Sequence, residues 1–422
     1  MVLNRLNLTY EYVYNLIEQG VIKDINTVVP VMGGLRLLHI ATFNNDKKLV
    51  DYLLRKKADV HKKSPYWGTA LNTAVIMDYL AITESLINYG ADVNTPILVP
   101  SYWTPFRYKF YQNDVEIAEL LLNRYDDVST ILNQYKLWVA KRPLQIAVER
   151  SKEAMVELLL KGNADLNRST HISGTPLIHH AIGVGNLPII KLLLAYGADV
   201  NDTSGSYFSQ VSPLHFAVQC HNAAAVELIL NDSMVDINRV ALSKLSALHS
   251  AVSEEDDNII RQLLNAGIDI NLKNTAGLTA FTRNRIYTQR INETIAEHIA
   301  KLSAANFYVS EENLAVVNRE NFGKLRNQCL SEIEKMKITY VGMSNVTFYN
   351  VLCNSEHKLA VSLSYVSDRT ILDLDIQSLF PLYGGMLSYR LKKALGRKKL
   401  LLNAISSTND IFHKIKLPII MS

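Results

Sequence analysis

Histidine, aspartate and cysteine are the side chains in this sequence whose chemistry suits metal binding or acid–base and nucleophilic catalysis. We interpret the recurring histidines as residues that begin helices and bond the backbone of a neighbouring loop. The recurring aspartates suit turns, where their carboxylates accept bonds from nearby amides. These histidines are His39, His215 and His249, and the aspartates are Asp59, Asp92, Asp127, Asp165, Asp199, Asp236 and Asp269.

Sequence motifs of the common catalytic and nucleotide-binding sites are missing from the chain: GxSxG, HExxH, GxGxxG and GxxxxGK[ST] do not occur. His179 and His180 are adjacent, so they point to different sides of a helix and do not chelate as a pair spaced by four would. Gly183-Val184-Gly185 is a loop pattern and not a phosphate-binding loop. We therefore expect no enzyme, no metal site and no cofactor.

Cys220, Cys329 and Cys353 are far apart, and no CxxC pair occurs. Few and unpaired cysteines indicate a reducing intracellular compartment. We expect all three to be plain buried thiols, because a free cysteine behaves as a small apolar core residue.

Two phased motifs identify a repeat. The aspartates are spaced by 33, 35, 38, 34, 37 and 33 residues, and each follows a leucine-rich segment. Between them stands a second pattern that resembles the T-P-L-H-x-A motif of ankyrin repeats. Its instances are RLLHIA from Arg36, TALNTA from Thr69, TPFRYK from Thr104, RPLQIA from Arg142, TPLIHHA from Thr175, SPLHFA from Ser212 and SALHSA from Ser246. The resemblance covers roughly residues 10–300 in seven units, and an eighth from Gly277 matches only the start.

The resemblance implies an all-α repeat fold: an ankyrin solenoid of helix-turn-helix units with β-hairpin-like fingers. Ser or Thr followed by Pro caps and opens the first helix of a unit. Small alanines let neighbouring helices approach, and glycines give left-handed ends to the second helices. No unit buries its apolar face alone, so neighbours must stack. These residues are Ala41, Ala74, Ala147, Ala217 and Ala251, and Gly90, Gly162, Gly197 and Gly267.

Three regions follow from this pattern. Residues 1–30 contain one amphipathic helix and Asp24-Ile25-Asn26, which predicts a capping half-repeat. Residues 31–305 form the array, and 306–422 a small, helical C-terminal domain. Lys109 and His180 occupy the position of the small residue, so we expect disturbed stacking around Lys109.

Function must then come from the surface, and we expect a protein partner on the concave face of the array. Aromatic residues in the fingers suit binding hot spots. The alternative is that these rings fold back onto their own helices. The candidates are Tyr66, Trp67, Tyr102, Trp103, Tyr207 and Phe208.

The C-terminal region resembles the PRANC tail of poxvirus and parasitoid-wasp ankyrin proteins. The resemblance is carried by CLSEIEKM (329–336), TFYNVL (347–352), the helix around Arg390 and the closing Leu417, Pro418, Ile419 and Ile420. It implies an F-box-like segment that docks on the Skp adaptor of cullin ubiquitin ligases. Ile420 stands where an acid is usual, and the sequence stops at Ser422, so we expect weak docking of this segment.

The net charge of +4 is too small to argue for nucleic acid, which we do not expect as a partner. No apolar stretch is long enough for a membrane-spanning helix, and we expect an intracellular protein, cytoplasmic or nuclear. The basic residues after Ser388 form either a solvated helix face or a patch for nuclear import or anionic surfaces. They include Arg390, Lys392, Lys393, Arg397, Lys398 and Lys399.

Overall fold

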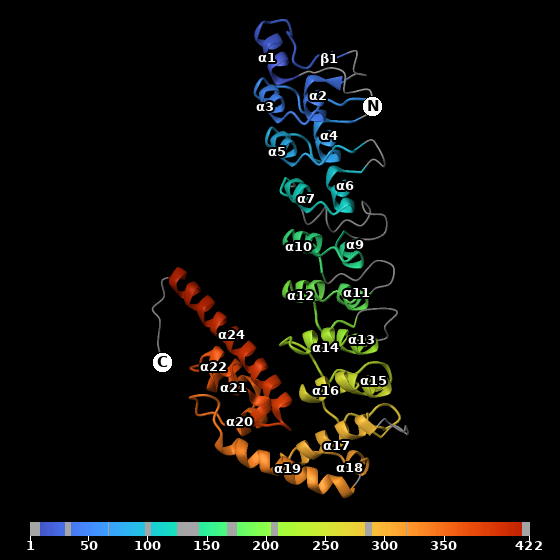
Figure 1. The fold of residues 1–422 in the computed structure, drawn as a ribbon, viewed down its shortest axis with the longest axis vertical. Helices are drawn as coiled ribbons and strands as arrows, with labels where there is room; N and C mark the ends of the chain where they lie inside the picture. Colours follow the sequence, from blue (N-terminus) through green and yellow to red (C-terminus); the bar gives the residue numbers. More distant parts are fainter. Residues whose placement is uncertain are drawn as a thin grey trace. The chain divides into compact units, whose positions relative to one another are not determined.

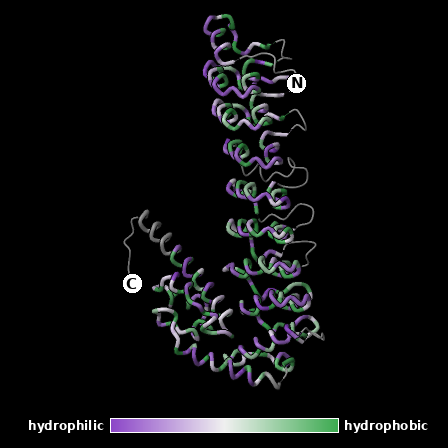
Figure 2. The backbone as a smooth tube through the Cα atoms, in the orientation of Figure 1, coloured by the Kyte–Doolittle hydropathy of each residue, from purple (hydrophilic) through white to green (hydrophobic). Residues whose placement is uncertain are grey.

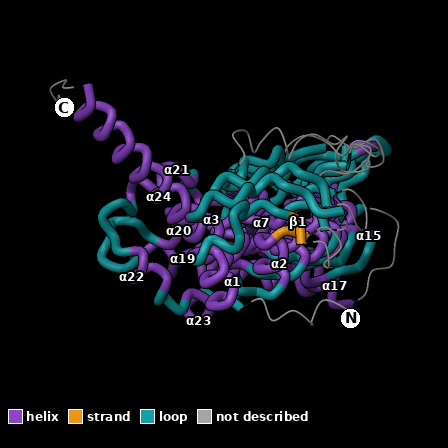
Figure 3. The backbone as a smooth tube through the Cα atoms, turned by 90° about the horizontal axis from the view of Figure 1, so that it is seen from above, coloured by secondary structure: helices purple, strands orange, loops and turns teal. Residues whose placement is uncertain are grey.

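The computed structural model describes residues 9–415 apart from 30–34, 66, 98–102, 125–142, 167–174, 204–209, 283–288 and 318. The chain divides into two compact units, residues 1–166 and 167–422. Helices make up most of the described structure in both (Figure 3), and the described residues contain one two-stranded sheet.

In the first unit, helix pairs follow a single leading helix, α1 (Tyr10–Glu18) (Figure 1). Strands β1 (Val28–Val29) and β2 (Leu35–Arg36) are antiparallel, with Val28 opposite Arg36. The pairs are α2 (Leu37–Phe43) with α3 (Lys47–Arg55), α4 (Ala70–Ile76) with α5 (Leu80–Asn88), α6 (Pro105–Gln112) with α7 (Val115–Leu122), and α9 (Pro143–Glu149) with α10 (Glu153–Lys161).

The second unit continues the same pairing and then changes to longer helices. Its pairs are α11 (Leu177–Val184) with α12 (Leu187–Ala195), α13 (Pro213–Gln219) with α14 (Ala223–Leu230), and α15 (Ala247–Ser253) with α16 (Asp257–Asn265). A short 3-10 helix, η4 (Leu242–Lys244), precedes α15. The remaining helices are α17 (Gln289–Ala304), α18 (Glu311–Ala315), α19 (Arg319–Ile338), α20 (Phe348–Cys353), α21 (Glu356–Ser362), α22 (Asp368–Leu372), α23 (Ile376–Leu379) and α24 (Gly384–Ile415).

Side-chain caps fix where the helices of each pair begin. At several first helices a Ser or Thr hydroxyl accepts the amide three residues on, and at most second helices an Asp or Asn does so; α5 and α10 have no side-chain cap. The first-helix caps are Thr69, Thr104, Ser212 and Ser246, and the second-helix caps are Asp46, Asp114, Asn186, Asn222 and Asp256. The predicted Ser/Thr-Pro start is confirmed at Thr104 and Ser212, where Pro occupies the first helical turn.

Apolar residues on the facing sides of the helices form the core of each unit, and hydrophobic and hydrophilic segments alternate along each helix (Figure 2). The alanines predicted to permit close approach are buried, with at most 1% of their surface exposed: Ala41, Ala74, Ala147, Ala217 and Ala251. Isolated antiparallel bridges, such as Ser64 with Gly68 and Ile97 with Trp103, close the bases of the fingers. The expected solenoid of helix pairs and hairpin-like fingers is therefore confirmed.

One predicted helix end is wrong. Gly90, Gly197 and Gly267 have the expected left-handed backbone, but Gly162 has φ −79°. The next residue, Asn163, takes the left-handed conformation with φ 59°. Asparagine tolerates this conformation better than most residues with a side chain, so it replaces glycine here.

The expectation of three buried thiols is wrong for two cysteines. Cys329 is fully buried on α19, but Cys220 and Cys353 are exposed. Cys220 follows the last residue of α13 and Cys353 ends α20, where the helix surface turns outward. The apolar character of cysteine was therefore not enough to predict whether a side chain at a helix end is buried.

The helices after the array share one core within the second unit. It begins in α17 with Ala300 and Ala304 and continues through α19, α20 and α21 to Leu395 on α24. The Tyr383 hydroxyl donates to the Lys301 carbonyl at 2.8 Å in the interior of this core. The segment EENLAVVNRENFGKLRNQCLSEIEKMK contains α18 and most of α19.

Helix α24 also packs against the outer helices of the last repeats. The Tyr389 hydroxyl donates to the Leu230 carbonyl at 2.8 Å, and Lys393 donates to the Asp232 carbonyl. Both carbonyls lie at the end of α14, where a helix leaves its acceptors unpaired. Gly385 lies against the Asn265 side chain, only 2.5 Å from where a Cβ would stand, so the helices meet closely here.

Lys109 takes the position of the small alanine on α6 and is completely buried. Its ammonium bonds Asp78, Asp114 Oδ2 at 3.0 Å and Gln112 Oε1 at 3.0 Å. Burial lowers the pKa of Lys109, and the Asp114 carboxylate opposes that change. The lysine is accommodated because its charge meets carboxylates and an amide at the edge of the helix pair.

Asp114→Asn tests this arrangement. The Asp114 Oδ1 atom also caps α7 by accepting the Ile117 amide at 3.2 Å, and asparagine keeps an oxygen for that cap. Loss of the carboxylate charge leaves Lys109 less compensated, so we expect the free energy of unfolding to fall by about 2 kcal/mol. Urea denaturation followed by circular dichroism measures this change.

Asp46→Asn is the matched control, because Asp46 caps α3 through the Leu49 amide at 3.0 Å. Among the described residues, no lysine or arginine forms an ion pair with Asp46. The decrease in the free energy of unfolding caused by Asp46→Asn is therefore expected to be much smaller than that caused by Asp114→Asn. Equal losses for the two variants would contradict a role for the Lys109 charge.

Candidate protein-binding surface

The recurring histidines connect neighbouring repeats. Each sits in the first turn of a first helix, and its Nε2 atom lies 3.0–3.1 Å from a backbone carbonyl of the next finger: His39 to Gly68, His179 to Val211, His215 to Leu245 and His249 to Leu278. The predicted structural role of His39, His215 and His249 is therefore confirmed. Burial lowers the pKa of His39, His179 and His215, which favours the neutral ring.

The aspartates make the predicted turns. Asp59, Asp92, Asp199, Asp236 and Asp269 each accept the amide two residues further on, at 2.8–3.2 Å. Asp127 lies outside the described residues. Among the described residues, no group of three or more His, Cys, Asp or Glu side chains is placed to hold a metal ion. Within these same residues, no helix is both long and apolar enough to cross a bilayer.

Asparagines make a second set of inter-repeat bonds that the sequence analysis missed. The Asn201 Oδ1 atom accepts the Asp236 amide and its Nδ2 atom donates to the Met234 carbonyl. In the same way Asn26 accepts the Asp59 amide and Asn238 the Asp269 amide. The recurrence of Asn two residues after Asp was the signal that could have indicated this ladder.

The asparagine ladder extends past the last finger. Asn271 accepts the Ser310 amide at 2.8 Å and donates to the Tyr308 carbonyl at 3.2 Å. These are the bonds that Asn201 makes to the following repeat, so the loop after α17 takes the place of a further Asp turn. Helix α17 thereby continues the array as a second helix does.

Trp67 and Trp103 are the two finger candidates that the structure describes, and both are half-buried. The Trp67 ring packs edge-on against Phe43 of α2, with centroids 5.7 Å apart, and its amide donates to Ser64 Oγ. The Trp103 ring stacks on Tyr111 of α6, with centroids 4.7 Å apart. Each ring therefore lies on a first helix and keeps part of its surface open.

Two arginines join the stack at Trp103. The Arg107 guanidinium carbon lies 4.8 Å from the Trp103 ring centroid and 5.9 Å from that of Tyr111. The Arg150 guanidinium carbon lies 5.3 Å from the Tyr111 centroid. We call Trp103, Arg107, Tyr111 and Arg150 the Trp103 cluster; Arg150 comes from the end of the next first helix, α9. The spacing of Arg107 and Tyr111 by four on one helix was a signal that the sequence analysis did not use.

The other candidates cannot be placed on this surface. Tyr66, Tyr102, Tyr207 and Phe208 lie outside the described residues, as do Leu417, Pro418, Ile419 and Ile420. Their binding roles therefore remain predictions.

The interpretation of the basic residues as one solvated helix face is wrong for three of them. Arg390 donates to the Val351 and Asn354 carbonyls at the end of α20. Lys393 and Lys398 are buried, and Lys398 bonds the Val366 carbonyl at 2.6 Å and Asp368 at 2.7 Å. Long side chains reached polar atoms of neighbouring helices, a contact that charge alone does not reveal. Lys392, Arg397 and Lys399 are exposed.

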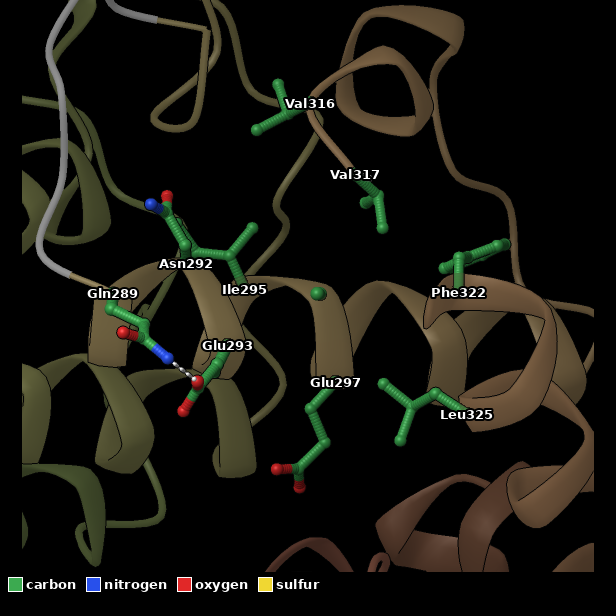
Figure 4. Close-up of a pocket in the computed structure, with 10 residues that line it drawn as sticks. Gln289, Asn292, Glu293, Ile295, Glu297, Val316, Val317, Phe322 and Leu325 are labelled. Atoms are coloured by element: carbon green, nitrogen blue, oxygen red, sulfur yellow. Dashed lines mark hydrogen bonds between the residues drawn. The ribbon is translucent and has the colours of Figure 1, made fainter. Parts of the chain in front are cut away.

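A cavity of about 730 Å³ lies between α17 and the segment from α18 to α19 (Figure 4). Ile295 and Ala296 of α17 form one apolar wall, and Phe322 and Leu325 of α19 another. Val316 and Val317 add to the apolar lining. The polar part of the lining comes from α17: Asn292, Glu297, Gln289 and Glu293, which accepts the Gln289 amide at 2.9 Å. Such walls suit an apolar group and offer no catalytic arrangement of side chains.

Comparison with known protein families agrees with this geometry. The family model described as ankyrin repeats in three copies matches residues 5–97, 37–133, 107–204 and 205–274, together more than half of the chain. The chain belongs to the ankyrin-repeat family. Ankyrin repeats imply a scaffold for protein–protein interaction.

Two curated relatives are ankyrin repeat proteins of fowlpox virus (strain NVSL). One is 29% identical over 165 residues, which are 39% of this chain and 47% of that protein. The other is 34% identical over 103 residues, 24% of this chain and 15% of that protein. The matched segments thus span less than half the length of these two relatives. The solved ankyrin repeat domain of Bcl-3 is 21% identical, with 59% of this chain and 93% of that chain covered at a TM-score of 0.32.

A buried histidine on α17 makes stability depend on pH. Complete burial lowers the pKa of His298 to about 3. Its pKa in the unfolded chain is near 6.5, so below that pH the unfolded chain binds a proton that the folded chain does not. The free energy of unfolding is therefore expected to fall by about 1.4 kcal/mol for each pH unit below 6.5 from this residue alone.

Urea denaturation at pH 7 and pH 5 measures this loss. His298→Gln removes the titrating ring and is expected to weaken the pH dependence, whereas His61→Gln, at an exposed histidine, is expected to keep that of the wild type. An unchanged pH dependence in His298→Gln would show that this ring does not cause it.

Proposed function

We propose that the partner binds the concave face of the array, where the finger bases meet the first helices, and that binding modulates signalling in a host cell. The single observation that carries this proposal is the half-buried Trp103 ring, stacked on Tyr111 beside two guanidinium groups. Tryptophan, tyrosine and arginine are the residues most enriched in interface hot spots.

The scaffold around this face supports the proposal. The finger bridge between Ile97 and Trp103 fixes the backbone of the ring, since the Ile97 amide donates to the Trp103 carbonyl at 2.7 Å. The cap at Thr104 fixes the start of α6 directly behind it. A ring that is held before binding loses little conformational entropy when a partner covers it.

Alanine substitution tests the face. Trp103→Ala and Trp67→Ala are expected to lower recovery of the partner by about tenfold or more, because a large buried contact is lost. Affinity purification with quantitative mass spectrometry compares these variants with wild type. Tyr89→Ala is the control, since Tyr89 is an exposed aromatic residue at the end of α5.

Circular dichroism must show that each variant is folded. If folded Trp103→Ala and Trp67→Ala recovered the same proteins in the same amounts as wild type, this face would not be the binding surface.

A second candidate function is a substrate adaptor of a cullin-type ubiquitin ligase, supported by the resemblance of the C-terminal region to PRANC tails. Some of the residues that carry this resemblance have structural roles: Cys329, Met336 and Phe348 are buried, and Thr347 forms a capping box with Asn350. Arg390 joins α24 to the end of α20.

Purified Skp and cullin in a pull-down with the full chain distinguish this candidate. Recovery that is lost in Leu417→Asp supports adaptor docking, because an acid replaces an apolar anchor of the segment. Failure of the wild-type chain to recover Skp would exclude it.

A further inference from the structure

The Trp103 cluster combines two flat cations with two aromatic faces on neighbouring first helices. A guanidinium that lies over a ring is attracted by the ring's electrons and keeps its N–H donors in its own plane. Those donors match the two oxygens of a carboxylate. The exposed parts of Trp103 and Tyr111 offer apolar surface next to them.

The carboxylates close to α6 are already engaged elsewhere. Asp78 and Asp114 both bond the buried Lys109, and Glu149 accepts the Gln145 amide at 2.9 Å. In the described part of the chain, no carboxylate lies within ion-pair distance of Arg150. An exposed guanidinium on the binding face is thus available to a carboxylate from outside.

The surroundings favour a peptide over a nucleic acid. A phosphate backbone calls for a stripe of cations, because each neutralised phosphate contributes to affinity. Here the cluster holds two arginines, and the Asp78 and Asp114 carboxylates lie near the same helix. The exposed Arg150 guanidinium beside the two rings fits an acidic side chain next to an apolar one.

We infer that the Trp103 cluster recognises an acidic segment of a protein partner, with an Asp or Glu paired to Arg150 and an adjacent apolar side chain on Trp103 and Tyr111. This inference rests on the proposed function, because it names the chemistry of the partner at the same face. Affinity should fall with added salt, since the contacts are charged and partly exposed.

Fluorescence anisotropy with short labelled peptides tests the inference on the full chain. One peptide alternates Glu with Leu, a second replaces each Glu by Gln, and a third replaces each Glu by Lys; labelled oligothymidylate is the nucleic-acid probe. The Glu-Leu peptide is expected to bind about tenfold more tightly than the Gln-Leu peptide. Arg150→Gln is expected to remove most of that preference.

The control is Arg55→Gln, at an exposed arginine that ends the second helix α3, and it should leave the preference intact. Arg150→Lys keeps the charge but loses the planar group, so it is expected to restore only part of the binding.

The outcomes separate this inference from the proposed function. If Trp103→Ala loses the cellular partner while the Glu-Leu and Gln-Leu peptides bind equally or not at all, the face binds protein but the acidic segment is wrong. If oligothymidylate binds more tightly than every peptide, the ligand is a nucleic acid and the inference is overturned. If Trp103→Ala and Arg150→Gln keep the partner, the proposed function fails as well.

Discussion

Burial of apolar surface between successive helix pairs is the constraint on which the structure depends. A pair such as α4 and α5 is too small to enclose its own apolar residues, so Leu71, Ile82 and Leu86 become buried only because neighbouring pairs cover them. The alanines on the first helices set how closely those pairs approach. Stacking of the helix pairs therefore determines which side chains are buried. The side chains that stay exposed are the ones available to a partner.

Hydrogen bonds make this stacking specific. Apolar burial has little direction, whereas the histidine bonds to the next finger and the asparagine bonds to the next Asp turn each permit one register. His215 bonds the Leu245 carbonyl from a first helix, and Asn201 bonds the Asp236 amide from a turn. A junction that has both bonds is held at two separated points, which keeps its finger base and its first helices in fixed relation.

Much of the fold could be predicted from the sequence because the motifs repeat a local physical rule: a capped helix start, a small residue, a left-handed end. The failures arise where a contact comes from a distant part of the chain. The charge of Lys393 predicted exposure, but the end of α14 supplies a carbonyl for it. At the end of α10 the left-handed residue is Asn163, one residue after the expected Gly162. A motif based on glycine does not reveal this, because asparagine also tolerates that backbone conformation. At the candidate site, Trp103 could be named from its type, but its contact with Arg107 and the contact of Arg150 with Tyr111 depend on how the first helices pack.

The asparagine ladder also bears on how such a chain changes over generations. Asn271 makes with Tyr308 and Ser310 the bonds that Asn201 makes with Met234 and Asp236. Because these two junctions have the same donors and acceptors, a gene that gains or loses one such unit still closes its last junction. A duplication that breaks a unit between the Asp turn and the next first helix would leave an amide and a carbonyl without partners. Copy number can therefore drift in whole units while both ends of the ladder stay intact.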